Sequence, residues 1–132
     1  MSPKNLRIVI ADTKYERRIY IEKNLNALGY FRIAEASSSL EALKLTLVPS
    51  CPVHLLIIEE NLMWHDNPHR SIQSGSTPLQ ILKYRALQHS DLLMLTEGIL
   101  PGLPDAATLS YIISARAQAL DSKTNLADII LK

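Results

Sequence analysis

Hydrophobic and polar positions follow two different periods along the first part of the chain. Residues 6–11 (LRIVIA) form a short run rich in β-branched side chains, which indicates a strand buried on both faces. Residues 14–28 change to helical spacing, with apolar side chains at i, i+4 and i+7 and charged side chains between them. Asp12 or Thr13 is suited to cap that helix, and Gly29 to end it. A strand followed by a helix therefore opens the chain.

The same order is predicted a second time. Residues 31–34 are a short strand candidate, and Ser38 and Glu41 have capping-box spacing ahead of leucines at helical intervals. Two prolines close this helix. Residues 53–58 (VHLLII) then form the most hydrophobic strand candidate of the chain, and two consecutive glutamates follow it.

The pattern is weaker in the second part of the chain. Residues 61–76 are polar and show neither period, which indicates a long loop. Apolar positions then return at helical spacing and predict a helix over residues 77–86, with Thr77 as its cap and Pro78 at its first position. Residues 91–95 (DLLML) are the candidate for a fourth strand.

The last part of the chain completes an alternating order of strands and helices. Residues 98–104 (GILPGLP) indicate a connection rich in breakers, and Asp105 is suited to cap a helix with an apolar face over residues 109–120. Residues 126–131 are the candidate for a fifth strand. This alternation predicts an α/β fold, a doubly wound parallel sheet of five strands in a single domain over residues 1–132.

Composition agrees with one folded domain and gives little information about partners. The chain has 132 residues, 47% hydrophobic and 20% charged, which is the ordinary globular range. A net charge of +1 gives no field that attracts nucleic acid or anionic lipid. Cys51 is the single cysteine, and residues 1–18 contain neither a signal peptide nor a membrane span. We therefore expect a cytoplasmic location.

Candidate chemistry gathers at the predicted carboxyl ends of the strands. In an open doubly wound sheet, the crevice that binds ligands lies beyond those ends. The residues expected there are Asp12, Thr13, Glu59, Glu60, Thr96 and Lys132.

In this order, the segments resemble the receiver domain of two-component response regulators, over nearly the whole chain. IVIADTKYERR resembles the first strand and the start of the first helix, HLLIIEENLM the third strand, DLLMLT the fourth and ADIILK the fifth. The resemblance implies a flavodoxin-like receiver topology that lacks the last helix. It also implies that Asp12 keeps the first acid, Thr96 the switch hydroxyl and Lys132 the phosphate-contacting lysine.

The departures from the receiver pattern fall on its chemistry. Thr13 stands where the family has its second acid, and Glu59 where it has the phospho-accepting aspartate. The extra methylene of Glu59 moves the carboxylate outward by about one C–C bond, in a kind of site where small displacements decide reactivity. Magnesium requires near-octahedral oxygen ligands, and phosphoryl transfer depends on that ion. We therefore expect no catalytic residues, no bound metal and no cofactor.

The resulting hypothesis is an atypical receiver-like signalling domain that acts without phosphorylation. It would contact a protein partner or form a homodimer, would not bind a membrane, and would reach nucleic acid only through an output domain outside this sequence. Glu59 either mimics a phosphorylated aspartate or has simply drifted. One alternative is a phosphorylatable receiver in which Asp12, Glu60 or Asp66 rebuilds the magnesium site; another is a small flavodoxin-like enzyme that uses the same crevice.

Two weaker signals have simpler interpretations. His65 and His69 lie in the polar loop with spacing that makes a poor zinc signature, so a solvated loop is preferred. Arg17 and Arg18, with Arg7 in the preceding strand, form a modest basic spot that is interpreted as a solvated face.

Overall fold

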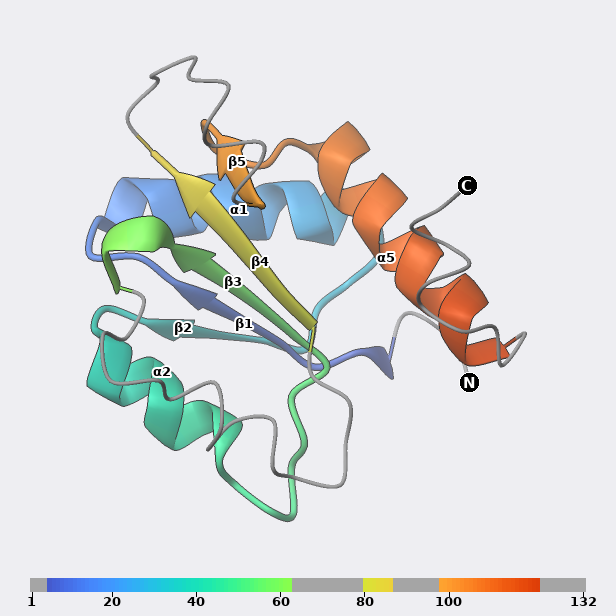
Figure 1. Ribbon diagram of the computed structural model, residues 1–132, viewed down its shortest axis with the longest axis horizontal. Helices are drawn as coiled ribbons and strands as arrows, with labels where there is room; N and C mark the ends of the chain where they lie inside the picture. The colour runs from blue at the N-terminus through green and yellow to red at the C-terminus, as the bar shows by residue number, and fades with distance from the viewer. Residues whose placement is uncertain (1–4, 63–79, 87–97, 122–132) are drawn as a thin grey trace.

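The computed structural model describes residues 5–62, 80–86 and 98–121, with only the backbone described for residues 116–121. Strands and helices alternate over residues 5–62 (Figure 1). In chain order the elements are β1 (Ile8–Ala11), α1 (Tyr15–Ala27), β2 (Ile33–Ala36), α2 (Ser39–Thr46), β3 (Leu55–Glu59), the 3-10 helix η2 (Glu60–Leu62), β4 (Gln80–Arg85), β5 (Ile99–Pro101) and α5 (Ala106–Asp121).

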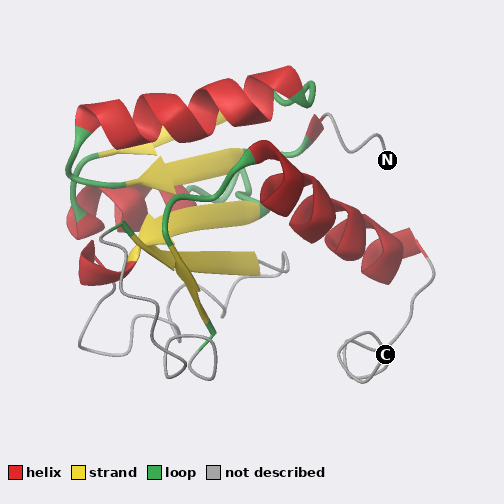
Figure 2. Cartoon of the chain, turned by 90° about the horizontal axis from the view of Figure 1, so that it is seen from above, coloured by secondary structure: helices red, strands yellow, loops and turns green. Residues whose placement is uncertain are grey.

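All five strands lie in one parallel sheet, in the order β2-β1-β3-β4-β5. The chain moves from β1 outward to β2, then crosses back to place β3 on the other side of β1. The order therefore reverses between β1 and β3, which is where doubly wound sheets form their crevice. The predicted five-stranded, doubly wound α/β fold is confirmed, and Figure 2 shows the strands as one layer.

Two apolar cores cover the two faces of the sheet, because successive side chains of a strand point to opposite faces. On one face, α1 and α5 pack against alternate residues of β1 and β3; this core includes Ile10, Ile57 and Leu109. On the other face, Ala42 of α2 packs against Val9 and neighbouring strand residues. Figure 1 shows α2 on the opposite side of the sheet from α1. Burial on both faces explains why β1 and β3 are continuously hydrophobic.

The ends of α1 differ partly from the prediction. Lys14 is the N-cap residue, rather than Asp12 or Thr13, and its side chain makes no capping bond. Asp12 instead accepts a hydrogen bond from the Lys14 backbone N–H at 2.9 Å. The predicted ending at Gly29 is confirmed, since this residue has a φ of 96°, in the left-handed region that glycine adopts without strain.

Two of the three other predicted caps, Ser38 and Asp105, are confirmed; the third, Thr77, lies outside the described residues. Ser38 accepts a hydrogen bond from the Glu41 N–H at 3.1 Å, and the Glu41 carboxylate reaches back to the Ser37 N–H at 3.0 Å. Asp105 accepts from the Thr108 N–H at 2.8 Å, and this bond lowers the pKa of the Asp105 carboxyl. The local sequence was sufficient to predict these two caps because each of them involves residues within four positions of one another.

The helix predicted over residues 77–86 is wrong where the structure describes it, because Gln80–Arg85 forms β4. This strand pairs with β3 on one side and β5 on the other. A short apolar segment satisfies a helical and an extended period about equally well, so its partners decide its conformation. Residues 77–79 lie outside the described residues.

The connection predicted over residues 98–104 is also wrong in part, because Ile99–Pro101 forms β5. Three residues are too few to show a period, and β5 lies at the edge of the sheet, where proline is tolerated. The helix α5 follows directly, so the expectation that the fold lacks its last helix is wrong as well. The strands predicted at residues 91–95 and 126–131 lie outside the described residues.

Smaller differences concern the other strands. β2 begins two residues later than predicted, and β3 extends to Glu59 instead of ending before it.

Among the helices of the described ranges, none has the length and apolar character needed to cross a membrane.

Candidate functional site

Three polar residues form a row at the carboxyl ends of the central strands. Asp12 follows β1, Glu59 ends β3, and Tyr84 lies opposite Glu59 in β4. Since Ala11 pairs with Ile58, the next positions of the two strands bring Asp12 beside Glu59. Asp12 has no exposed surface and Glu59 is 5% exposed. The structure therefore brings together the two acids that the sequence predicted here.

The carboxylate of Asp12 has a partner on each oxygen. Its Oδ2 accepts a hydrogen bond of 2.7 Å from the Tyr84 hydroxyl, which reaches across β3 to the end of β1. Its Oδ1 accepts from the Lys14 N–H at 2.9 Å and lies 3.6 Å from Nη1 of Arg17. Asp12 is thus a buried carboxylate held by donors from two elements of its own chain.

Tyr84 is a neutral hydrogen-bond donor in this position. Burial raises the pKa of its hydroxyl far above the ordinary value, and the hydrogen bond to Asp12 and the negative charges of Asp12 and Glu59 raise it further. The proton therefore stays on Tyr84 and is directed toward Asp12.

Glu59 joins the ends of two strands. Its Oε1 accepts a hydrogen bond from the Asn61 N–H at 2.7 Å, in the turn that follows β3. Its Oε2 accepts from the Ala86 N–H at 3.3 Å, directly after β4. One carboxylate therefore satisfies backbone donors that follow two neighbouring strands, β3 and β4.

Glu60 turns away from this row and forms a bidentate ion pair with Arg85. Nη2 of Arg85 lies 2.6 Å from Oε1 of Glu60, and Nε of Arg85 contacts Oε2. The hydrogen bonds and positive charge of Arg85 lower the pKa of the Glu60 carboxyl, against a smaller opposing effect of burial. This pair links η2 to β4.

The basic spot predicted on the first helix is largely paired with polar groups. Arg18 donates from Nη1 to the backbone oxygen of Asp12 at 2.6 Å and from Nε to Glu35 at 2.9 Å. Its guanidinium also lies over the Tyr15 ring, 5.7 Å from the centroid. With 14% of its side chain exposed, Arg18 does not belong to a solvated face.

Of the remaining predicted site residues, the structure describes only Thr13, which does not join the row. Thr13 is exposed, and Thr96 and Lys132 lie outside the described residues. The structure instead places Arg85 and Ala86 at the end of β4 and Gly102 directly after β5. Gly102 has a φ of 85° and donates its N–H to the Arg85 carbonyl at 2.8 Å.

Sequence reasoning missed Tyr84 and Arg85 because it assigned their segment to a helix. The available signal was composition: residues 80–85 (QILKYR) include a β-branched and an aromatic residue, and residues 99–101 are bounded by two glycines. Neither feature reveals the contact with Asp12, which joins residues 72 positions apart.

The described residues do not fit a magnesium ion of the kind the receiver resemblance implies. Within residues 5–62, 80–86 and 98–121, no three His, Cys, Asp or Glu side chains are grouped so that they could hold a metal. Both oxygens of Asp12 already accept hydrogen bonds, and the second acid of the pattern is Thr13. A hard cation would have to displace Tyr84 and approach the Arg17 guanidinium.

Comparison with known proteins gives a likeness of fold. No protein-family model matches the sequence, and no curated protein does. A solved structure described as a response regulator receiver domain protein from Clostridium thermocellum superposes with a TM-score of 0.70 and 20% sequence identity, over 90% of this chain and 99% of that one. The chain therefore has the receiver-domain fold, of flavodoxin-like topology.

Proposed function

We propose that this chain is a receiver-fold signalling domain that acts through protein contacts and without phosphorylation of a carboxylate. The observation that carries the proposal is the buried 2.7 Å hydrogen bond from Tyr84 to Asp12. It supports a crevice whose first acid is already used inside the protein. The assignment as a single non-enzymatic domain, located in the cytoplasm and contacting nucleic acid only through a separate output domain, belongs to this proposal.

The other acids support the same interpretation. Glu59 would have to give up hydrogen bonds from two backbone donors before attacking a phosphodonor. Glu60, considered as a replacement magnesium ligand, is bound to Arg85 on both oxygens. Asp66, the other candidate replacement, lies outside the described residues. Among residues 5–62, 80–86 and 98–121, no contact favours a rebuilt metal site or a flavodoxin-like enzyme.

Glu59 supports a fixed signalling state. A phosphoryl group presents strong acceptor oxygens and can order a neighbouring segment by accepting new hydrogen bonds. In this chain, the Glu59 carboxylate accepts the N–H groups that follow β3 and β4 and so holds the two segments together. We propose that Glu59 maintains constitutively what phosphorylation would control.

The first test exposes the protein to acetyl phosphate with magnesium and measures its intact mass. We expect no phosphoryl adduct and no rise in the melting temperature with magnesium and beryllofluoride. A variant carrying Thr13→Asp, Glu59→Asp and Tyr84→Phe shows whether restoring the missing groups restores the response. An adduct on the wild-type protein, or a magnesium-dependent rise in its melting temperature, would contradict the proposal.

The second test follows amide hydrogen exchange at Asn61 and Ala86. Glu59→Ala should accelerate exchange at both sites, because both N–H groups lose their acceptor. Glu60→Gln, which leaves these two bonds intact, is the control. If Glu59→Ala leaves both rates and the oligomeric state unchanged, Glu59 does not hold this end of the sheet.

A further inference from the structure

Basic residues form a second row at the opposite, amino ends of the strands. Ile8 of β1 pairs with Ile33 of β2 and with Leu55 of β3. The preceding positions therefore place Arg7 between Arg32 and His54, as the backbone hydrogen bonds from the Ile8 N–H to Arg32 and from the His54 N–H to Arg7 confirm. The His54 ring also accepts the Arg7 N–H at Nδ1, at 3.0 Å.

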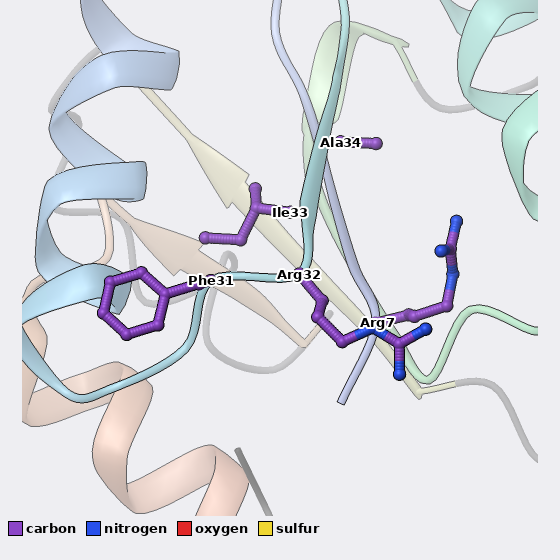
Figure 3. Close-up of a pocket in the computed structure, with 5 residues that line it drawn as sticks. All are labelled: Arg7, Phe31, Arg32, Ile33 and Ala34. Atoms are coloured by element: carbon purple, nitrogen blue, oxygen red, sulfur yellow. The ribbon is translucent and has the colours of Figure 1, made fainter. Parts of the chain in front are cut away.

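A cavity of about 340 Å³ opens beside this row. It is lined by Arg7, Phe31, Arg32, Ile33 and Ala34. Figure 3 shows that Arg7 and Ala34 project to one side of β2 while Phe31 and Ile33 project to the other. The cavity therefore lies along the edge strand, with Arg7 and the small Ala34 on one side of β2 and the larger apolar side chains of Phe31 and Ile33 on the other.

The two arginines lack the ionic partners that the other described arginines have. Arg17, Arg18 and Arg85 each lie within ion-pair distance of a carboxylate. Within the described ranges, Arg7 and Arg32 have no such partner. Nε of Arg7 is buried with no hydrogen-bond acceptor there, and Arg32 donates from Nη1 only to the neutral carbonyl of Asn5, at 3.1 Å.

This arrangement is unfavourable without an anion. Like charges in neighbouring positions of adjacent strands repel one another, and a buried guanidinium nitrogen without an acceptor has lost its hydration without compensation. An oxyanion between the two side chains would remove both costs. The geometry of a guanidinium group matches phosphate or carboxylate oxygens, which it binds with two parallel hydrogen bonds.

We propose that Arg7 and Arg32 form a binding site for the phosphate monoester group of a small ligand. A phosphate monoester carries a charge of about −1.5 to −2 at neutral pH and so balances two guanidinium groups, which a single carboxylate does not. The volume of this cavity is near the lower end of the range found for small-molecule pockets, about 300 to 1,000 Å³. It has room for a short organic group beside the phosphate. The site is at the opposite end of the sheet from Asp12 and is independent of the function proposed there.

The test is a titration of the full chain, followed by amide NMR and thermal melting, with inorganic phosphate, glycerol phosphate, glycerol and acetate. Both phosphate compounds should shift the signals of Arg7 and of residues 32–34 saturably and raise the melting temperature. Glycerol should do neither, and acetate should bind more weakly. Tighter binding of glycerol phosphate than of inorganic phosphate would identify an ester as the ligand; equal binding would identify free phosphate and overturn the ester assignment.

Substitutions then locate the site. Arg32→Gln, at an exposed position that should not disturb folding, and Arg7→Gln should each weaken phosphate binding by about tenfold, the loss expected for a charged hydrogen bond. Lys23→Gln on α1, also exposed, removes the same charge elsewhere and should leave affinity unchanged. Absence of saturable binding, or equal weakening by Lys23→Gln, would overturn the proposal.

Discussion

Tyr84 connects the chemistry of the crevice with the stability of the fold. Its ring belongs to the core beneath α1 and α5, while its hydroxyl supplies a hydrogen bond to the buried Asp12. A buried carboxylate that loses a donor bears the desolvation cost of the oxygen left unpaired. The residue that donates to Asp12 Oδ2 therefore also makes the burial of this carboxylate tolerable.

Replacing Tyr84 with phenylalanine tests this double role. Tyr84→Phe should lower the free energy of unfolding by about 1–3 kcal/mol, because Asp12 Oδ2 loses its buried donor while the ring remains. Urea denaturation measures the loss. Tyr111→Phe is the matched control, since Tyr111 is 77% exposed and should change stability little. Equal effects of the two substitutions would show that the Tyr84 hydroxyl contributes nothing specific.

The raised pKa of Tyr84 also predicts a dependence on alkaline pH. The folded protein holds the proton of Tyr84 more tightly than the unfolded chain does, so this stabilisation is fully present below about pH 10 and is lost as pH rises beyond that value. Tyr84→Phe should therefore lose stability less steeply than wild type above about pH 10. Parallel stability curves for the two proteins would contradict this assignment.

At the scale of elements, the Glu60–Arg85 pair links η2 to the end of β4. The pair is bidentate and partly buried, with the Glu60 and Arg85 side chains 24% and 30% exposed. Its contribution to the free energy of unfolding should therefore lie near the upper end of the range for surface ion pairs. Because Glu60 has a lowered pKa when folded, the pair stabilises the protein above the pKa of an unfolded glutamate, about 4.3, and loses that contribution as pH falls.

This pH dependence can be measured with Glu60→Gln. At neutral pH the variant should be less stable by about 0.5–1 kcal/mol. The difference should shrink below about pH 4, where the wild-type carboxyl becomes protonated and resembles the amide. Denaturation at a series of pH values provides the comparison, with Glu22→Gln on α1 as control. A difference that persists unchanged into acid would assign the effect to packing instead of charge.

The elements of the first half of the chain and α5 were predictable from the sequence, whereas β4 and β5 were not. β1, α1, α2 and β3 have long runs of one period bounded by glycine, serine or proline, so local sequence was sufficient. β4 has only one fully buried residue, Tyr84, and β5 has three residues in all. Neither shows a period, and both become strands through hydrogen bonds to their neighbours.

At the scale of the whole molecule, one core joins both halves of the chain. Leu109 and Ile113 of α5 are buried against residues of α1, β1 and β3. Leu109→Ala should therefore lower the free energy of unfolding by about 2–5 kcal/mol, as expected for a fully buried leucine. Ser110→Ala on the same helix, at an exposed position outside this core, is the control. A loss below about 1 kcal/mol would show that α5 contributes little to folding.

The two ends of the sheet differ in how their charges are satisfied. At the carboxyl ends, each acid of the crevice has donors from its own chain. At the amino ends, Arg7 and Arg32 have no carboxylate partner among the described residues. With a net charge of only +1, composition gave no indication of this separation. It follows from strand register.

The sequence by itself determined the class of fold and the position of two acids. Alternating strands and helices with short connections produce a parallel sheet, whose carboxyl ends lie at one edge, so Asp12 and Glu59 were expected at the same edge, and the pairing of β1 with β3 makes them neighbours. Only the tertiary structure decided which segments became β4 and β5, and that the Tyr84 hydroxyl donates a hydrogen bond to Asp12. Such contacts join residues far apart in the chain, and strand pairing and burial create them without leaving a local periodic signal.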